Sequence, residues 1–178
     1  ILKLILEKSE LSHSRPVMKQ VKNLLGKNLS QLVKINTHLG NYDEAVAFSE
    51  EATRLLKHWP YAFVDHMKIE SELYSSQEKL YLALESLDNA LKTCDLEGLD
   101  IRKISLLKIK LDLLKANKLE RSALDVAEEI NIFKARIQKE RMSSLFEGLE
   151  HKSDLMFRKE QLSEAKQKQV LISSLLGA

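Results

Sequence analysis

The sequence predicts an all-α fold, and two observations carry that prediction. The chain of 178 residues holds only five glycines and two prolines, too few turn residues for a sandwich or barrel of many short strands. Apolar residues recur instead at the spacing of amphipathic helices, as in Val17–Val33, Leu80–Leu91 and Ile101–Leu114, and no stretch sustains a period of two. A chain of this length is expected to form one helical domain or one repeat array.

Turn residues divide the first part of the chain into helices. The Ser14–Pro16 segment is typical of a helix start, because proline is tolerated in a first helical turn. Gly40 closes that helix, since glycine readily adopts the left-handed conformation of a helix C-terminus. The His58–Pro60 segment divides the two helices that follow.

Later boundaries are less regular. Ser75 and Glu78 have the spacing of a capping box ahead of the next helix, and residues 94–100 around Gly98 are interpreted as a loop. Asn117–Lys118 ends another helix, and turn residues are scarce beyond it. The C-terminal part therefore forms either the long first helix of a hairpin or one extended helix, and the sequence leaves both open.

A recurring motif begins at the first of these turns. Gly40, Tyr42 and Ala45 have the spacing G-x-Y-x-x-A, and Ala52 follows seven residues after Ala45. This segment resembles the tetratricopeptide repeat (TPR), a helix-turn-helix unit. The same pair of anchor positions recurs at Ala83 and Ala90, Ala123 and Ile130, and Ala165 and Ile172. The first anchors of successive pairs are 38, 40 and 42 residues apart, longer than the repeat of the family.

The resemblance implies a right-handed α-α superhelix of about four antiparallel TPR-like hairpins. We expect one domain over 1–178, with an N-terminal helical segment over 1–23. The hairpins are expected over about 24–58, 60–94, 100–131 and 132–176. An irregular antiparallel bundle is the alternative. Because the chain opens at Ile1 without an initiator methionine, we also expect it to be a fragment of a longer protein.

The resemblance also implies a binding surface on the first helices of the hairpins, which line the inner face of such arrays and bind extended peptides or partner helices. The inner-face positions would be Lys27, Ser30, Lys34, Thr37, Asp65, Lys68, Glu72, Ser75, Ser105, Lys108, Asp112, Lys115, Glu147, Glu150, Asp154 and Phe157. Lysines dominate the first three hairpins, which favours a peptide with acidic groups. The candidate binding residues are Lys27, Lys34, Lys68, Glu72, Lys108, Asp112 and Lys115.

The residue patterns offer no candidate for catalysis, a metal or a cofactor. The five histidines are dispersed. His66 and the adjacent Asp65 point about 100° apart on a helix and cannot form an orienting acid–imidazole pair, so both are interpreted as surface residues. Cys94 lies next to Asp95, which raises the pKa of the thiol and disfavours a nucleophilic thiolate. Glu70 and Glu72 are interpreted as a solvated helix face, and no phosphate-binding or nucleophile motif occurs. The sequence therefore predicts a protein that is not an enzyme.

Charge and hydropathy favour a protein or peptide as the partner. The net charge of +2 divides into +5 over residues 1–40, −8 over 41–100, +4 over 101–140 and +1 over 141–178. This pattern lacks the basic stripe and recognition motif of a nucleic-acid-binding protein. No apolar stretch approaches the roughly 20 residues that span a bilayer. We expect a cytoplasmic protein without nucleic-acid or membrane contacts.

Aromatic residues concentrate in one place, the segment Trp59–Phe63. Tryptophan and tyrosine dominate interface hot spots, so this segment is one candidate for an interface anchor. We favour the alternative that it fills the junction between the first and second hairpins, where large aromatic surfaces are buried.

The leading functional hypothesis is a non-catalytic scaffold that binds a protein or peptide on the concave face of the array. The alternative is a sensory or regulatory region of a signalling protein, which dimerises through its C-terminal helix and relays to an output domain. A coiled-coil seam for such a dimer starts at Met142, Leu145, Leu149 and Met156. Lys152 and Lys159 interrupt this seam, which makes a coiled coil the less favoured use of the helix.

Overall fold

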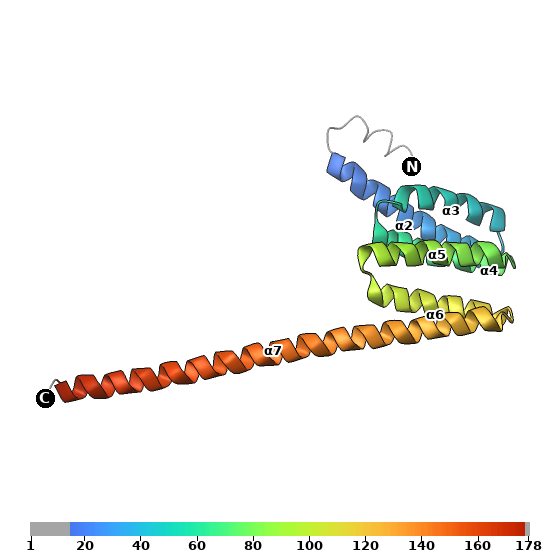
Figure 1. Cartoon of the computed structure of the whole chain (residues 1–178). Coiled ribbons are helices and arrows are strands. Elements are labelled where there is room, and N and C mark those ends of the chain that lie inside the picture. The colour runs from blue at the N-terminus through green and yellow to red at the C-terminus, as the bar shows by residue number, and fades with distance from the viewer. Residues whose placement is uncertain (1–14, 177–178) are drawn as a thin grey trace. The chain divides into compact units, whose positions relative to one another are not determined.

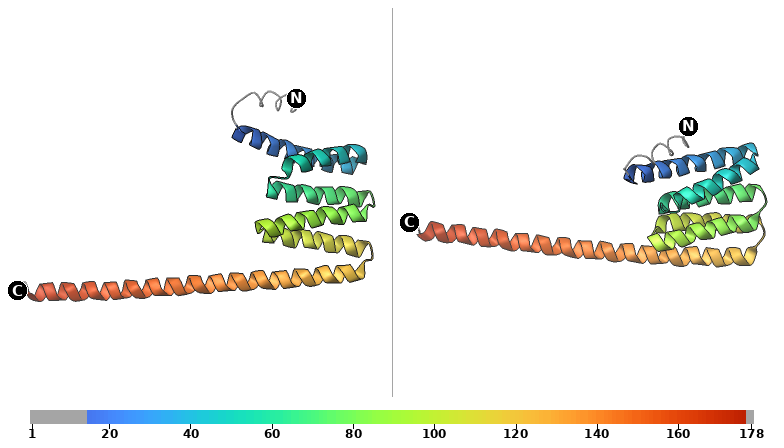
Figure 2. Two further views of the ribbon diagram at one scale, coloured as in Figure 1. Left: turned by 45° about the horizontal axis from the view of Figure 1, so that its top comes forward. Right: turned by 90° about the horizontal axis from the view of Figure 1, so that it is seen from above.

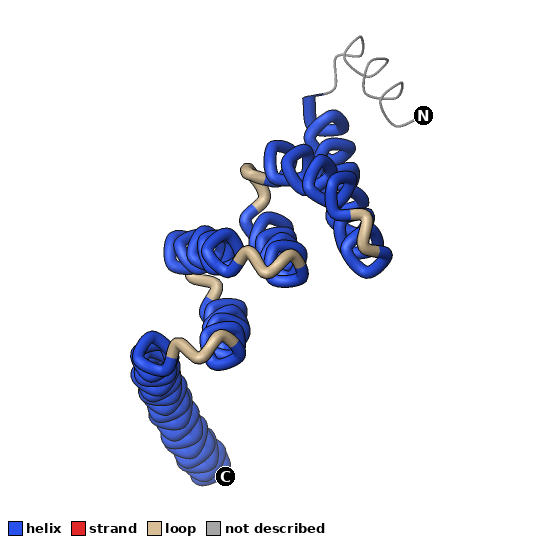
Figure 3. The backbone as a smooth tube through the Cα atoms, turned by 90° about the vertical axis from the view of Figure 1, so that its right-hand side faces the viewer, coloured by secondary structure: helices blue, strands red, loops and turns tan. Residues whose placement is uncertain are grey.

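The computed structural model describes residues 15–176, which contain helices and no strand (Figures 1 and 3). The prediction of an all-α fold is confirmed for this part of the chain. The helices are α2 (Arg15–Leu39), α3 (Tyr42–Leu56), α4 (Pro60–Ser76), α5 (Leu80–Glu97), α6 (Asp100–Ala116) and α7 (Glu120–Leu176). Packing divides the chain into two units, residues 1–130 and 131–178, with the boundary inside α7.

In the first unit, consecutive helices pack side by side in chain order (Figure 2). α2 packs against α3, α4 packs against α5, and α3 contacts α4, while α2 also contacts α4 and α5 contacts α6. Ala123 and Ile130, in the first part of α7, belong to the same buried cluster as Leu107 of α6. The unit is therefore a succession of three helix pairs.

The turns inside the three helix pairs have the same backbone structure. Gly40, Glu78 and Lys118 all have left-handed backbones, with φ of 78°, 60° and 59°. The next residue in each turn donates its N–H to a carbonyl oxygen five residues back, as in the Schellman motif. These bonds are Asn41 to Asn36 at 2.9 Å, Lys79 to Tyr74 at 2.9 Å and Leu119 to Leu114 at 3.0 Å. Each left-handed residue lies five positions before the first anchor alanine of its pair, so the turns repeat with the anchors.

The predicted capping box at Ser75 and Glu78 is wrong. Ser75 lies within α4, Glu78 is the left-handed turn residue, and Lys79 precedes α5 without a side-chain cap bond. The sequence was misleading here because the turn uses backbone hydrogen bonds, and a left-handed glutamate is uncommon enough to be overlooked.

The predicted anchor residues are buried in the first three helix pairs. Ala45, Ala52, Ala83 and Ala90 have no exposed surface, and Ala123 and Ile130 are each 5% exposed. Small side chains at these positions let neighbouring helices approach closely. The fourth predicted pair, Ala165 and Ile172, falls in the part of α7 whose side chains lie outside the described residues.

Residues 94–100 do not form the predicted loop. α5 continues to Glu97, Gly98 ends it with a left-handed backbone, and α6 begins at Asp100. Cys94 is therefore a helical residue, only 1% exposed. Burial raises the pKa of the Cys94 thiol, and the neighbouring Asp95 raises it further, as its position in the sequence indicates.

The second unit begins within α7, which runs from Glu120 to Leu176 without a turn. Of the two structures that the sequence leaves open for residues 132–176, the extended helix is the one found, and a hairpin is not formed there. Gly148 continues the helix because one glycine in a helix interior costs only about 1 kcal/mol.

Candidate functional site

The seven predicted binding residues are all exposed on the first helices of their pairs. Lys27 and Lys34 lie on α2, Lys68 and Glu72 on α4, and Lys108, Asp112 and Lys115 on α6. On each helix their spacing of three, four or seven residues places them on one face. We call these seven residues the lysine face, and none of them lines the cavity described below.

Other inner-face positions are engaged in contacts within the first unit, among them Ser30 and Asp65. Ser30 is only 4% exposed, and its hydroxyl donates to the Gly26 carbonyl oxygen at 2.9 Å. Asp65 forms an ion pair with Arg102 of α6. The prediction that Ser30 faces a ligand is wrong, because α2 turns this side chain toward α4.

Ser30 belongs to a buried polar cluster centred on His66. The interpretation of His66 as a surface residue is wrong, since its side chain on α4 has no exposed surface. Its Nδ1 lies 3.0 Å from the Ser30 hydroxyl, and its Nε2 lies 3.1 Å from the Ser49 carbonyl oxygen and 3.0 Å from the Thr53 hydroxyl. A carbonyl oxygen only accepts, so Nε2 carries the proton of the neutral ring, and Nδ1 accepts from the Ser30 hydroxyl, which shares its one proton between Nδ1 and the Gly26 carbonyl oxygen. The imidazole thereby links α2, α3 and α4.

Glu70 extends this cluster from α4 to α5. Its two carboxylate oxygens accept the hydroxyls of Ser49 on α3 and Ser86 on α5, both at 2.8 Å. Glu70 is half-buried, so its interpretation as part of a solvated face is wrong, while Glu72 is exposed. Charge-assisted bonds of this kind are about twice as strong as neutral ones, and here they join three helices.

The geometry of the His66 cluster differs from that of a serine hydrolase. In such enzymes the acid orients the histidine, which in turn accepts the proton of the nucleophilic serine. Here Glu70 accepts from Ser49 rather than from the imidazole, and both Ser49 and His66 have no exposed surface. A substrate cannot reach these atoms, so the cluster serves to hold the helices together.

Burial of His66 predicts a pH-dependent stability. Burial lowers the pKa of the His66 imidazole below its ordinary 6.5, against the weaker opposing effects of Glu70 and the Ser49 carbonyl. Below pH 6.5 the unfolded chain binds a proton that the folded chain resists, so the free energy of unfolding falls as the pH drops from 6.5 toward the folded pKa. Urea denaturation at pH 7.5 and 5.5 should show this loss, and His66→Gln should reduce it. His38→Gln, which removes an exposed imidazole but keeps His66, should retain the wild-type loss; an unchanged loss in His66→Gln would contradict the assignment.

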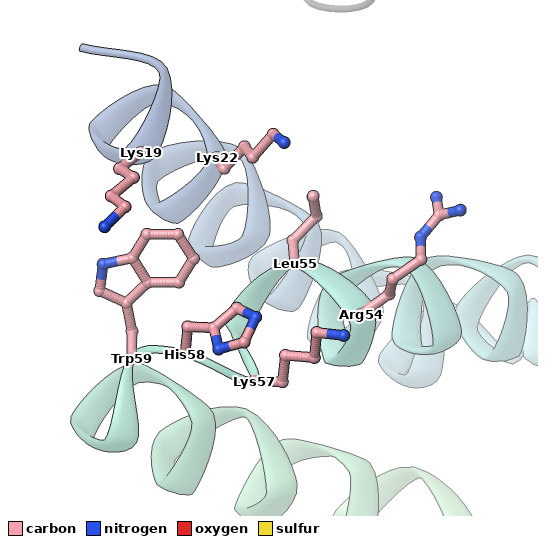
Figure 4. Close-up of a pocket in the computed structure, with 7 residues that line it drawn as sticks. All are labelled: Lys19, Lys22, Arg54, Leu55, Lys57, His58 and Trp59. Atoms are coloured by element: carbon pink, nitrogen blue, oxygen red, sulfur yellow. The ribbon is translucent and has the colours of Figure 1, made fainter. Parts of the chain in front are cut away.

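A cavity of about 720 Å³ lies between α2, the end of α3 and the turn into α4 (Figure 4). It is lined by Lys19, Lys22, Arg54, Leu55, Lys57, His58 and Trp59. Three lysines and one arginine make the lining basic, and Leu55 and Trp59 add apolar surface. Closely spaced cations around a cavity raise the local concentration of anions, and apolar walls with a few polar groups are typical of ligand sites.

Trp59 connects this cavity to the core. Together with Phe63 it packs against a buried cluster of Leu25, Leu29, Ala52, Leu56 and Ala62 from α2, α3 and α4. This agrees with the prediction that the aromatic segment fills the junction between the first and second helix pairs. The neighbouring Tyr61 is 61% exposed, with the Arg102 guanidinium 5.2 Å from its ring centre.

The cavity is the part of the site that sequence reasoning missed. The segment Lys57–Trp59 is basic and aromatic, but Lys19 and Lys22 lie far from it in the sequence. In an antiparallel helix pair, the end of the second helix lies beside the beginning of the first. The expected pairing of α2 with α3 was therefore the signal that could have grouped Lys19 and Lys22 with Lys57–Trp59.

The described part of the chain shows neither a metal site nor a membrane span. No three His, Cys, Asp or Glu side chains in it are grouped to hold a metal ion. No helix within residues 15–176 combines the length and apolar character needed to cross a bilayer. No family model, curated protein or solved structure matches the chain.

Proposed function

We propose that this chain is a non-catalytic protein- or peptide-binding scaffold built from TPR-like helical hairpins in a right-handed superhelix. Support for the repeat comes from the three equivalent turns, whose left-handed residues are separated by 38 and 40 residues, as are the anchor alanines. The contact between α2 and α4 joins the first helices of successive hairpins, as stacking of repeats requires.

The basic cavity around Trp59 is the observation that carries the proposal. Lys22, Arg54 and Lys57 favour a ligand with carboxylate groups, and the indole favours an apolar or aromatic side chain between them. The ligand class is therefore an acidic peptide segment that carries a large apolar residue. The lysine face extends the same preference for acidic groups along α2, α4 and α6.

The chain contains a single tryptophan, so its fluorescence reports on the cavity alone. A peptide in which glutamates flank one phenylalanine should change the fluorescence emission of Trp59. A peptide with lysine in place of each glutamate should not change it. Reversing the charge in Lys22→Glu/Arg54→Glu/Lys57→Glu should raise the Kd at least about tenfold, because three attractive contacts become repulsive.

The matched control reverses three charges on the lysine face, Lys34→Glu/Lys68→Glu/Lys108→Glu. A larger loss of affinity in the cavity variant supports the cavity as the main site, and a larger loss in the control assigns binding to the lysine face. The proposal is contradicted when neither variant changes the affinity, or when the wild-type chain does not bind the acidic peptide.

A second candidate function is a regulatory helical region that dimerises through α7 and relays a change of state to an output domain. The observation that favours it is a set of exposed large apolar side chains along the second unit of α7. Exposed apolar surface of this extent marks interaction sites in proteins.

A further inference from the structure

An apolar stripe runs along the second unit of α7. Six side chains, each 47–62% exposed, make it up: Met142, Leu145, Phe146, Leu149, Met156 and Phe157. At about 100° per residue these positions fall within a face about 120° wide. The stripe is about 24 Å long at the rise of a helix, and we call it the α7 stripe.

The α7 stripe fits a heptad register that differs from the one expected from the sequence. Met142, Leu149 and Met156 are seven residues apart and occupy d positions, with Phe146 and Ser153 at a. In this register Lys152 and Lys159 take g positions beside the seam. The two lysines therefore flank the apolar contact instead of interrupting it.

The two edges of the α7 stripe carry opposite charge. The basic edge consists of Arg141, Lys152 and Lys159, and the acidic edge consists of Glu147, Glu150 and Asp154. All six side chains are exposed. At about 100° per residue, the three basic residues lie roughly 80–100° to one side of the stripe and the three acidic ones roughly 80–140° to the other.

This separation of charge distinguishes the two orientations of a helix pair. In a parallel pair of identical helices, the g edge of one faces the e edge of the other, so the side with Lys152 and Lys159 at g faces the side with Glu150 at e. In an antiparallel pair, g faces g and e faces e, so Lys152 and Lys159 of one helix approach the same lysines of the other. Charges at these edges set orientation in coiled coils.

We propose that the α7 stripe binds a second copy of this chain as a parallel coiled coil over about residues 142–159. The inference rests on the second candidate function and names its partner and orientation. The apolar seam supplies the attraction, and the complementary edges select the parallel arrangement.

The first experiment tests the stripe in the whole chain by sedimentation at several concentrations. The wild-type protein should dimerise with rising concentration. Leu149→Glu should raise the dimer dissociation constant at least about tenfold, because it places a charge in both halves of the seam. Leu162→Glu is the matched control, since Leu162 is 61% exposed and Leu149 62%, on opposite faces of the helix. It should change the constant less than about twofold, and circular dichroism should show both variants as helical as the wild type.

The second experiment tests orientation by disulfide formation under mild oxidation. In a parallel pair, Met142→Cys meets its own equivalent, and so does Met156→Cys, so each variant alone should form a covalent dimer. Bridging requires Cα atoms within about 7 Å, whereas positions 142 and 156 are about 21 Å apart along a helix. The wild-type chain is the control, because its one cysteine is buried.

The possible results separate the two claims. Covalent dimers only in a mixture of the two variants would show an antiparallel pair, which overturns the proposed orientation but keeps dimerisation. A wild-type chain that stays monomeric at the highest concentration would overturn both the inference and the second candidate function. Equal effects of Leu149→Glu and Leu162→Glu would overturn the α7 stripe as the contact.

Discussion

Replacing Leu87 with alanine is expected to lower the free energy of unfolding by about 2–5 kcal/mol. Leu87 has no exposed surface and belongs to the largest buried cluster, which joins α4, α5, α6 and the first part of α7. The alanine would remove the transfer free energy of the missing atoms and leave a cavity where helices from two hairpins meet. Urea denaturation followed by circular dichroism measures the loss.

Leu96→Ala provides a control for this effect on the same helix. Leu96 is 85% exposed, so the same substitution should change the free energy of unfolding by less than about 0.5 kcal/mol. Comparable losses in the two variants would mean that α5 packs with a different face than the structure shows.

Gly26→Ala is expected to destabilise the protein although it places a better helix former in α2. A Cβ atom at Gly26 would lie 2.6 Å from both Cγ and Cδ2 of Leu56, a fully buried side chain. Overpacking of this kind costs about 1–3 kcal/mol. It should outweigh the gain in helix propensity, which is at most about 1 kcal/mol. Thermal and urea denaturation should therefore both show a less stable variant.

Gly148→Ala is the matched control for the close approach at Gly26. Gly148 lies in α7, and a Cβ atom there would meet nothing within 4 Å. The substitution should raise helicity or stability by up to about 1 kcal/mol. A loss of stability in Gly26→Ala together with a gain in Gly148→Ala would establish the contact between α2 and α3. A gain of stability in both variants would contradict it.

The sequence predicted the helices well because their boundaries depend on local chemistry. Gly40 and Pro60 act on their own segments, and both mark boundaries in the structure. Turn residues are scarce after residue 118, so the sequence indicated either a hairpin or a single long helix there. The structure contains the single long helix. The helix end predicted at Asn117–Lys118 is confirmed, whereas Glu78 was missed as a turn residue because its side chain does not favour the left-handed backbone that it adopts.

The polar core and the cavity were missed in the sequence because both combine residues from separate helices. His66 reads as a surface residue until α2 and α3 bring Ser30 and Ser49 to its ring. Lys22 and Lys57 meet around Trp59 only after α2 and α3 pair in antiparallel order. Burial of a polar residue depends on its partners in space, and a helical pattern in one segment does not identify them.

The left-handed turns at Gly40, Glu78 and Lys118 tolerate different side chains at the same backbone position. Each turn is closed by backbone N–H and carbonyl groups, which every residue except proline supplies. A glycine can therefore be replaced by glutamate or lysine at a cost of about 1–2 kcal/mol while the hairpin stays intact. The turn between α5 and α6 has the same bond, from the Leu99 N–H to the Cys94 carbonyl oxygen at 2.9 Å, so one backbone structure closes turns of different sequence within and between the helix pairs.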